Sequence, residues 1–278
     1  MSTITVYRGF KAEPNFVWSP YVTKLEARFR FAGVPYKVGE GSPRAGPKGK
    51  IPYITLTPAA VPSSSSSSSP STGIQGGPET ETLGDSTLII KALCESGRLP
   101  DLHARLSKTE RAHDLALRAL LEEKLSPYHT WERWTQNYYT MRDHVLWALP
   151  WPVRVLVASM IYRSTVATLH GQGTGRFSAE EIALFRREIW ESFADLVLES
   201  KTKIMGASSS SSGEEPFWVL GGPEPTEVDA TLFGFVVSTL LCTAGPGSQA
   251  DLRSFPVLLE YARRIQERYF PDYEALPA

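Results

Sequence analysis

Cysteine is nearly absent from this sequence. Only Cys94 and Cys242 occur among the 278 residues, too far apart for the short spacings of a zinc knuckle or a CxxC redox pair. Both lie in apolar helical patterns, so we expect two buried, unreactive thiols and no metal site. The hydrophobic content of 42% is instead enough for two modest domains with apolar cores.

Strong net charge and long apolar runs are also missing. A formal net charge of −1 gives no electrostatic signature of nucleic-acid binding. No apolar run reaches the roughly 18 to 20 residues that a membrane-spanning helix needs, and the N-terminal segment lacks the basic and then apolar order of a signal peptide. The sequence therefore predicts a soluble, cytoplasmic protein with no nucleic-acid partner and no membrane span.

Serine, by contrast, is concentrated in two stretches. Ser63–Ser69 lies inside a segment of about 58–78 that is rich in Pro and Gly, and Ser208–Ser212 lies inside a segment of about 206–215. Such segments bury too little apolar surface to offset the entropy lost on ordering. We interpret both as disordered loops inserted within domains, because the flanking segments complete one another's pattern.

The first part of the chain alternates strand and helix patterns. Strands are predicted at Ile4–Tyr7, Val34–Val38, Ile51–Leu56 and Glu79–Leu83. One helix begins at Ser19-Pro20, an N-cap followed by proline, and ends near Gly33, and another follows Gly84-Asp85-Ser86. This β-α-β and then β-β-α order is typical of a thioredoxin-like α/β domain, which we assign to residues 1–103.

The remaining residues, 104–278, carry no convincing strand pattern. Apolar residues recur there every three to four positions, as in amphipathic helices. The predicted helices are Leu115–Lys124, Tyr128–Trp147, Val153–Leu169, Ser178–Ile204, Thr226–Cys242 and Ser254–Phe270. The second domain is therefore predicted to be an all-α helical bundle.

Two short motifs in the first domain resemble glutathione-binding elements of the glutathione S-transferase superfamily, namely Lys50–Tyr53 and Gly84–Ser86. The resemblance implies a cis peptide before Pro52, a preceding residue whose backbone pairs with the cysteinyl part of glutathione, and an acidic-Ser pair that holds the γ-glutamyl group. An exposed backbone edge suits a peptide, and a helix N-terminus suits a carboxylate. The glutathione-binding residues implied are Lys50, Ile51, Pro52, Asp85 and Ser86. The alternative is a plain X-Pro turn and a plain N-cap.

The segment Trp18–Glu26 resembles the start of the first helix in metaxin-like and failed-axon-connections-like members of this superfamily. By this resemblance, Ser19 takes the place of the first cysteine of a thioredoxin active site. A hydroxyl and unpaired N–H groups at a helix N-terminus can stabilise the glutathione thiolate. Ser19 is therefore the first candidate for the activating group, and Tyr7, placed as in tyrosine-type transferases, is the second. Ser19 as a simple N-cap and Tyr7 as an ordinary strand residue are the alternatives.

A third motif lies in the helical domain. Phe217–Gly222 followed by Pro225–Phe233 resembles a signature of the superfamily's helical domain, with Val228 in place of the usual small residue. Thr226 and Asp229, three positions apart, predict a capping box at the start of a buried helix. We expect this motif to serve folding, without a catalytic role for Asp229.

Aromatic residues are dense between residues 128 and 139. In the superfamily the corresponding helix lies over the glutathione sulfur, so these rings are candidates for binding a flat or lipophilic co-substrate. The predicted substrate-binding residues are Tyr128, Trp131, Trp134 and Tyr138, with His129 and Arg133 as polar contacts. The alternative is that most of these rings are core between helices.

Together these motifs predict a glutathione-dependent transferase, with glutathione as its co-substrate, that attacks a hydrophobic electrophile. Two alternatives stay open. One is a glutathione-dependent cis/trans isomerase of a conjugated alkene, because thiolate addition and elimination need the same groups. The other is a non-enzymatic, metaxin-like adaptor. A homodimer is expected by analogy with the superfamily.

Overall fold

The computed structural model describes residues 3–58, 80–207 and 216–277. Contacts divide the chain into a sheet unit, Met1–Pro14 with Arg28–Pro100, and a helical unit, Asn15–Ala27 with Asp101–Ala278. The two Ser-rich loops that we predicted fall almost wholly outside the described residues.

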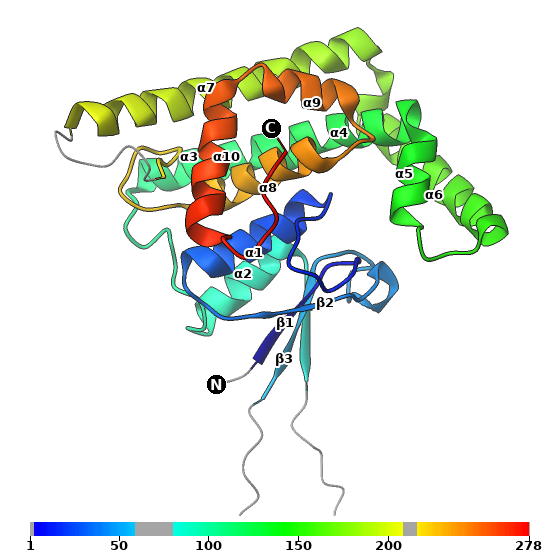
Figure 1. Ribbon diagram of the computed structural model, residues 1–278, viewed down its shortest axis with the longest axis horizontal. Coiled ribbons are helices and arrows are strands. Elements are labelled where there is room, and N and C mark those ends of the chain that lie inside the picture. The colour runs from blue at the N-terminus through cyan, green and yellow to red at the C-terminus, as the bar shows by residue number, and fades with distance from the viewer. Residues whose placement is uncertain (1–2, 59–79, 208–215, 278) are drawn as a thin grey trace, which may run out of the picture. The chain divides into compact units, whose positions relative to one another are not determined.

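The sheet unit contains a small mixed sheet (Figure 1). Its strands are β1 (Thr3–Tyr7), β2 (Lys37–Gly39), β3 (Tyr53–Thr57) and β4 (Glu81–Gly84), in the order β2-β1-β3-β4. β1 is parallel to β2 and antiparallel to β3, and β3 is antiparallel to β4. Val6 and Ile54 on the two central strands are fully buried, as expected where alternate residues face a core. The predicted thioredoxin-like fold is confirmed.

The described part of this unit contains three helical segments: the end of α1 (Pro20–Phe31), of which Arg28–Phe31 belongs to it, the 3-10 helix η1 (Pro43–Ala45) and α2 (Ser86–Glu95). The buried Arg28 donates a hydrogen bond from Nη2 to the carbonyl oxygen of Pro100. It thereby joins the end of α1 to the segment that follows α2.

The second strand is shorter than predicted. Val34 donates its N–H to the carbonyl of Phe29 at 2.9 Å and so completes the exit of α1, while Pro35 has no N–H to give to a ladder. β2 therefore begins at Lys37. For the same reason β3 begins at Tyr53, directly after Pro52.

The described part of the helical unit contains helices and no strand, as predicted. In chain order the elements are α3 (Lys108–Ala119), η2 (Leu120–Leu125), α4 (Ser126–Trp131), η3 (Glu132–Gln136), α5 (Tyr138–Val145), α6 (Trp151–Gly171), η4 (Thr174–Arg176), α7 (Ala179–Ala207), α8 (Glu227–Leu241), α9 (Pro246–Arg253) and α10 (Pro256–Tyr269). η2 and η3 are π-helical turns, and η4 is a 3-10 helix.

Helix α8 is the core of the helical unit. Every residue from Glu227 to Leu240 is buried, and α8 contacts α3, α9 and α10. The capping box predicted at its start is present: Asp229 accepts hydrogen bonds from the N–H of Thr226 at 2.7 Å and from the N–H of Val219 at 2.8 Å. The hydroxyl of Tyr261 on α10 donates to the same carboxylate at 3.0 Å.

The helix predictions in this unit were incomplete at three places. The helix predicted over Leu115–Lys124 begins earlier, at Lys108. The helix predicted over Tyr128–Trp147 is interrupted by η3 and by Asn137, whose φ of −122° and ψ of 38° are not helical. Helix α9 was not predicted, because its Pro246-Gly247 start has the composition of a loop. Its first turn is instead held by a distant side chain, since the carboxylate of Glu132 accepts the N–H of Gly247 at 2.7 Å.

Helices α5 and α6 pack beside each other as a helical hairpin (Figure 1). Although α6 is largely apolar, only its residues Ala158 and Leu169 are buried. Within the described ranges no single helix meets the length and hydropathy criteria for crossing a membrane, and only α8 and α9, bent by 120°, do so as a pair.

Candidate functional site

The strand register gathers the predicted glutathione-binding residues at one end of the sheet. Tyr53, the first residue of β3, lies opposite Gly84, the last residue of β4. It also lies opposite Tyr7, the last residue of β1. The Ile51-Pro52 peptide just before β3 and the Asp85-Ser86 pair just after β4 therefore share this end of the sheet, which we call the rim.

The peptide bond between Ile51 and Pro52 is cis, as the family resemblance implied. Pro52 is buried and Ile51 is half-buried. Among the described residues no hydrogen bond engages the backbone N–H or C=O of Ile51. Both groups are therefore available to a peptide-like ligand, whereas such groups are normally paired when a strand is internal to a sheet.

Lys50, the remaining predicted residue of this motif, is exposed. Its carbonyl oxygen lies where the chain turns tightly, because a Cβ built on Gly46 would be only 2.5 Å from it. A side chain at position 46 would therefore displace the Lys50 carbonyl, and with it the start of the Ile51-Pro52 segment.

Asp85 has an unusual backbone conformation, with a φ of 77° that no other non-glycine residue of the described chain shares in sign. Its carboxylate caps α2 by accepting the N–H groups of Thr87 at 3.1 Å and Leu88 at 3.2 Å. Backbone outliers of this kind cluster at functional sites. The two hydrogen bonds show that Asp85 has the capping role predicted as the alternative. This cap also fixes the position of the next residue, Ser86.

Ser86 is the first residue of α2 and is only 4% exposed. No hydrogen bond of its hydroxyl is found within the described part of the chain. A hydroxyl at a helix N-terminus, together with the partial positive charge of that terminus, is a suitable donor for a carboxylate.

Tyr7 is held by the sheet itself. Its ring stacks on that of Tyr53, with centroids 4.5 Å apart and planes 13° apart. Its hydroxyl accepts a hydrogen bond from Oγ1 of Thr55 at 3.4 Å. A Cβ on Gly39 would lie 2.9 Å from the Tyr7 ring, so the end of β2 covers that ring closely. These contacts favour the strand-residue alternative for Tyr7.

Ser19 lies at the start of α1, in the part of the chain that belongs to the helical unit, and is half-buried. The carbonyl of the preceding residue, Trp18, accepts hydrogen bonds from Ser238 Oγ on α8 and from Arg133 Nη1 at 3.4 Å. Arg133 Nη2 also donates to Ser238 Oγ at 3.2 Å. The Trp18-Ser19 peptide is therefore fixed by two other helices, with its N–H directed opposite to the held carbonyl.

His144 on α5 lies flat against the indole of Trp18, with ring centroids 3.4 Å apart and planes 10° apart. Burial, and then the charge of Arg133, lower the pKa of His144 to about 4. This imidazole is therefore neutral near neutral pH. Sequence reasoning missed both His144 and Ser238, because each is far from Trp18 in the chain and no local pattern marks the contact.

The aromatic residues predicted to bind substrate divide by burial. Tyr128 and Trp134 are buried, at 8% and 7% exposure, whereas Trp131 and Tyr138 are half-buried. The Tyr128 ring stacks on Phe185 of α7 with centroids 6.1 Å apart. Burial, and then the charge of Glu188, raise the pKa of Tyr128.

Trp134 and Tyr138 form a separate group. Their ring centroids are 6.3 Å apart, and Tyr138 makes an edge contact with Tyr162 on α6 at 5.4 Å. His129 is buried, and burial followed by the charges of Arg133 and Arg186 lowers its pKa well below the usual value. His129 is thus a neutral core residue, and of the four predicted rings the half-buried Trp131 and Tyr138 are the more accessible.

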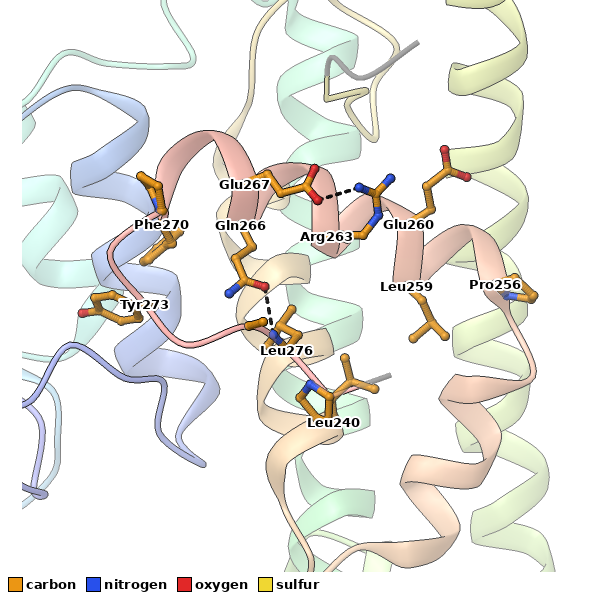
Figure 2. Close-up of a pocket in the computed structure, with 13 residues that line it drawn as sticks. Leu240, Pro256, Leu259, Glu260, Arg263, Gln266, Glu267, Phe270, Tyr273 and Leu276 are labelled. Atoms are coloured by element: carbon orange, nitrogen blue, oxygen red, sulfur yellow. Dashed lines mark hydrogen bonds and ion pairs between the residues drawn. The ribbon is translucent and has the colours of Figure 1, made fainter.

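A cavity of about 670 Å³ lies elsewhere in the helical unit (Figure 2). Leu240, Leu259 and Phe270 form apolar parts of its wall. Gln266 closes one side by donating to the carbonyl of Glu274 at 2.6 Å and accepting the N–H of Leu276 at 3.0 Å. None of the predicted site residues lines this cavity.

The cysteines take no part in the rim. Cys242 is buried, as predicted, and burial raises its pKa, while Cys94 is only half-buried. In the described ranges no three His, Cys, Asp or Glu side chains come together in a way that could hold a metal ion.

Known proteins were compared with this chain by sequence and by structure. Residues 20–141, less than half of the chain, match the family model described as "Glutathione S-transferase N-terminal domain". The glutathione transferase GSTFuA2 from Phanerochaete chrysosporium is similar in structure, with a TM-score of 0.52, 15% identity, and coverage of 97% of this chain and 99% of that one.

Two further solved structures have the same TM-score of 0.52. One is a glutathione S-transferase from Rhodospirillum rubrum F11, at 14% identity, covering 96% of this chain and 90% of that one. The other is Ure2p in complex with glutathione, at 10% identity, covering 97% of this chain and 91% of that one. At these identities the likeness shows the fold, which is that of glutathione transferases.

Proposed function

We propose that this chain is a glutathione-dependent transferase of the glutathione S-transferase superfamily. The observation that carries the proposal is the register of β3 and β4, in which Tyr53 lies opposite Gly84. It brings the unpaired backbone of Ile51 and the hydroxyl of Ser86 to one rim, where a single tripeptide can use both.

In the proposed complex, glutathione lies along the rim. The cysteinyl part pairs with the N–H and C=O of Ile51, as an added strand would. The γ-glutamyl carboxylate accepts a hydrogen bond from Ser86 at the N-terminus of α2, and Asp85 keeps that turn in place. Lys50, which directly precedes Ile51 and Pro52, is exposed and belongs to the same proposed site.

The proposed reaction begins when the glutathione thiol loses its proton to solvent. The thiolate then forms a carbon–sulfur bond with an apolar electrophile, and the electron pair of the broken bond departs with the leaving group. Ser19 is the proposed activating group, because a hydroxyl and a free peptide N–H at a helix start lower the pKa of a thiol. The hydrogen bonds to the Trp18 carbonyl keep that peptide in one orientation.

Four finer statements belong to the same proposal. The resemblance of the segment around Lys24-Leu25-Glu26 supports an assignment to the metaxin and failed-axon-connections branch. Trp131 and Tyr138 contact the hydrophobic co-substrate, with the buried Tyr128 and Trp134 behind them. The protein acts in the cytoplasm. It acts there as a homodimer.

Calorimetric titration with reduced glutathione tests the binding site. We expect the wild-type protein to bind, and Ser86→Ala to bind about tenfold more weakly because a hydrogen bond to a charged carboxylate is lost. Ser96→Ala is the matched control, since Ser96 lies at the other end of α2 and its hydroxyl donates to the carbonyl of Leu93. No heat of binding with the wild-type protein would favour the adaptor alternative.

Turnover with an aryl halide tests the activating group. Ser19→Ala should keep glutathione binding but lower the rate about tenfold or more and raise the pH at which the bound thiol ionises. Tyr7→Phe is the comparison variant, and we expect no change because the Tyr7 hydroxyl is engaged by Thr55. The opposite pattern would transfer the role to Tyr7. Mass analysis of the products separates conjugation from isomerisation, in which free glutathione is regenerated.

A further inference from the structure

Exposed apolar side chains of the described chain are concentrated at one place on the helical unit. Of twelve large apolar residues that are exposed, seven lie on α5, on α6 or in the turn between them. They are Tyr139, Trp147, Trp151, Val153, Val155, Leu156 and Met160. We call this group the hairpin tip; in Figure 1 the turn that joins α5 to α6 projects away from α7, α8 and α10.

Four of these side chains are exposed over more than half of their surface. Tyr139, Trp151, Leu156 and Met160 are 70%, 68%, 66% and 65% exposed. Leu156 and Met160 are four positions apart and therefore share one face of α6. A helix that is apolar around most of its circumference is normally buried. The face of α6 that carries Leu156 and Met160 would therefore be expected to pack against other residues, whereas it is exposed.

Charge around the hairpin tip is mostly positive; the exception is Asp143 on α5, which is paired with Arg142 and Arg154. From His144 to Ala179 the sequence contains Arg154, Arg163 and Arg176 and no Asp or Glu, although the whole chain carries a net charge of −1. Arg163 and Arg176 are exposed. Arg163 lies seven positions after Leu156, on the same face of α6, so the apolar patch continues into a basic one.

The turn at the hairpin tip is held in shape from within. The guanidinium of Arg154 donates to the carbonyl oxygens of Trp147 at 3.1 Å and of Leu149 at 3.0 Å. It also contacts the carboxylate of Asp143 at 3.4 Å. The exposed tryptophans on either side of the turn are therefore presented on a fixed backbone.

We propose that the hairpin tip docks onto the surface of a membrane that contains anionic lipids. Tryptophan rings prefer the interface between headgroups and acyl chains, and Leu156 and Met160 would enter the acyl boundary beside them. Arg163, three positions after Met160, would contact lipid phosphates, while the Asp143 carboxylate is already paired with Arg142 and Arg154. A second copy of this chain fits less well, because a symmetric contact through this segment would bring together two surfaces that each carry an excess of positive charge.

Sedimentation of the full chain with vesicles tests the proposal. We expect binding to vesicles of phosphatidylcholine with phosphatidylserine, weaker binding to phosphatidylcholine alone, and loss of binding as salt is added. The double variant Leu156→Glu with Met160→Glu should bind at least about tenfold more weakly. The matched control is Leu184→Glu with Leu198→Glu on α7, at 64% and 50% exposure, which should bind as the wild-type protein does.

Arg163→Glu separates the two parts of the contact. It should reduce binding to the anionic vesicles and leave the weak binding to phosphatidylcholine unchanged. The circular dichroism and urea midpoints of all variants should equal those of the wild-type protein, because the substituted side chains are exposed.

Three results would overturn the proposal. One is no sedimentation of the wild-type protein with either kind of vesicle. Another is equal binding by the Leu156→Glu, Met160→Glu variant. The third is a wild-type dimer in solution that this double variant converts to monomer while neither protein binds vesicles, which would make the hairpin tip an interface between copies.

Discussion

Helices α6 and α8 are both apolar, yet they have opposite surroundings. All residues of α8 from Glu227 to Leu240 are buried, while α6 has only Ala158 and Leu169 buried over its 21 residues. From apolar composition alone, the two helices would be expected to be buried to a similar extent. The difference lies in their partners: α8 is enclosed by α3, α9 and α10, and α6 contacts α5, short turns and the neighbouring α4.

This contrast separates two uses of apolar surface. Burial of α8 stabilises the fold, because the transfer of its side chains from water occurs when the chain folds. The exposed apolar residues of α6 do not stabilise the fold by burial within the chain. A role for them therefore requires contact with something outside the described structure.

Leucine truncations in the two helices should give the largest difference. Leu232→Ala on α8, where Leu232 is fully buried, should lower the free energy of unfolding by roughly 3 to 5 kcal/mol. Leu156→Ala on α6 should change it by less than about 0.5 kcal/mol. Urea unfolding of both variants beside the wild-type protein measures the two effects, and similar losses would contradict the contrast between the helices.

The N-terminal caps of α8 and α3 should give the second largest difference in unfolding free energy. Asp229→Ala leaves the N–H groups of Val219 and Thr226 and the hydroxyl of Thr226 without their acceptor, at a cost of about 3 kcal/mol. Unfolding should be measured above the pKa of about 6 to which burial raises this carboxyl. Glu110→Ala, in the exposed capping box of α3, is the control and should cost less. Equal losses would mean that burial does not strengthen the cap.

The start of α8 and the rim motifs show what sequence could predict. Thr226 and Asp229 lie within one turn, so their spacing alone encodes the cap. The Pro52 and Asp85-Ser86 motifs are likewise local, and the strand pattern placed them on neighbouring strands, which the register confirms. Periodicity also gave the helical unit, because most of its helices carry a regular apolar repeat.

Features that depend on distant residues escaped prediction. The π-helical turn η3 hardly changes the apolar repeat, so the break at Asn137 was invisible. Helix α9 is capped by Glu132, and the Trp18 carbonyl is held by Arg133 and Ser238, both from elements far away in sequence. The exposure of α6 was equally hidden, because a repeat of apolar residues does not identify what covers them.

Ser238 tests whether α8 also serves the proposed chemistry. Ser238→Ala removes a donor to the Trp18 carbonyl and a partner of Arg133, and should lower the free energy of unfolding by about 1 kcal/mol. Because the Trp18-Ser19 peptide would be held less firmly, we expect conjugation to slow about threefold to tenfold with glutathione affinity unchanged. The control is Ser164→Ala on the exposed side of α6, which should alter neither property. A loss of glutathione affinity in Ser238→Ala would contradict a positioning role.

The smallest effect concerns pH and the first turn of α8. The carboxylate of Asp114 accepts the N–H of Val228 at 2.8 Å and contacts His103 Nε2 at 2.9 Å. The hydrogen bond with Asp114 is the main reason that the pKa of His103 is raised; the charges of Asp114 and Glu227 add to it, while burial and Arg118 oppose it. Burial alone would raise the pKa of Asp114, but His103, Arg118 and the Val228 N–H outweigh it and the pKa is lowered.

The sign of the pH effect follows from which state binds the proton more tightly. Because the folded protein holds the His103 proton more strongly, this stabilisation is complete below the ordinary histidine pKa of about 6.5 and is lost as the pH rises through the raised pKa of the folded state. Over that pH range the unfolding free energy of the wild-type protein should decline as the pH rises. His103→Gln should lack the part of this decline that comes from His103. His113→Gln, at an exposed position on α3, should keep the wild-type slope. Both variants should still lose stability in acid, as the pH falls to the lowered pKa of Asp114. If His103→Gln kept the wild-type slope of unfolding free energy against pH, the contact of Asp114 with α8 would not depend on the charge of His103.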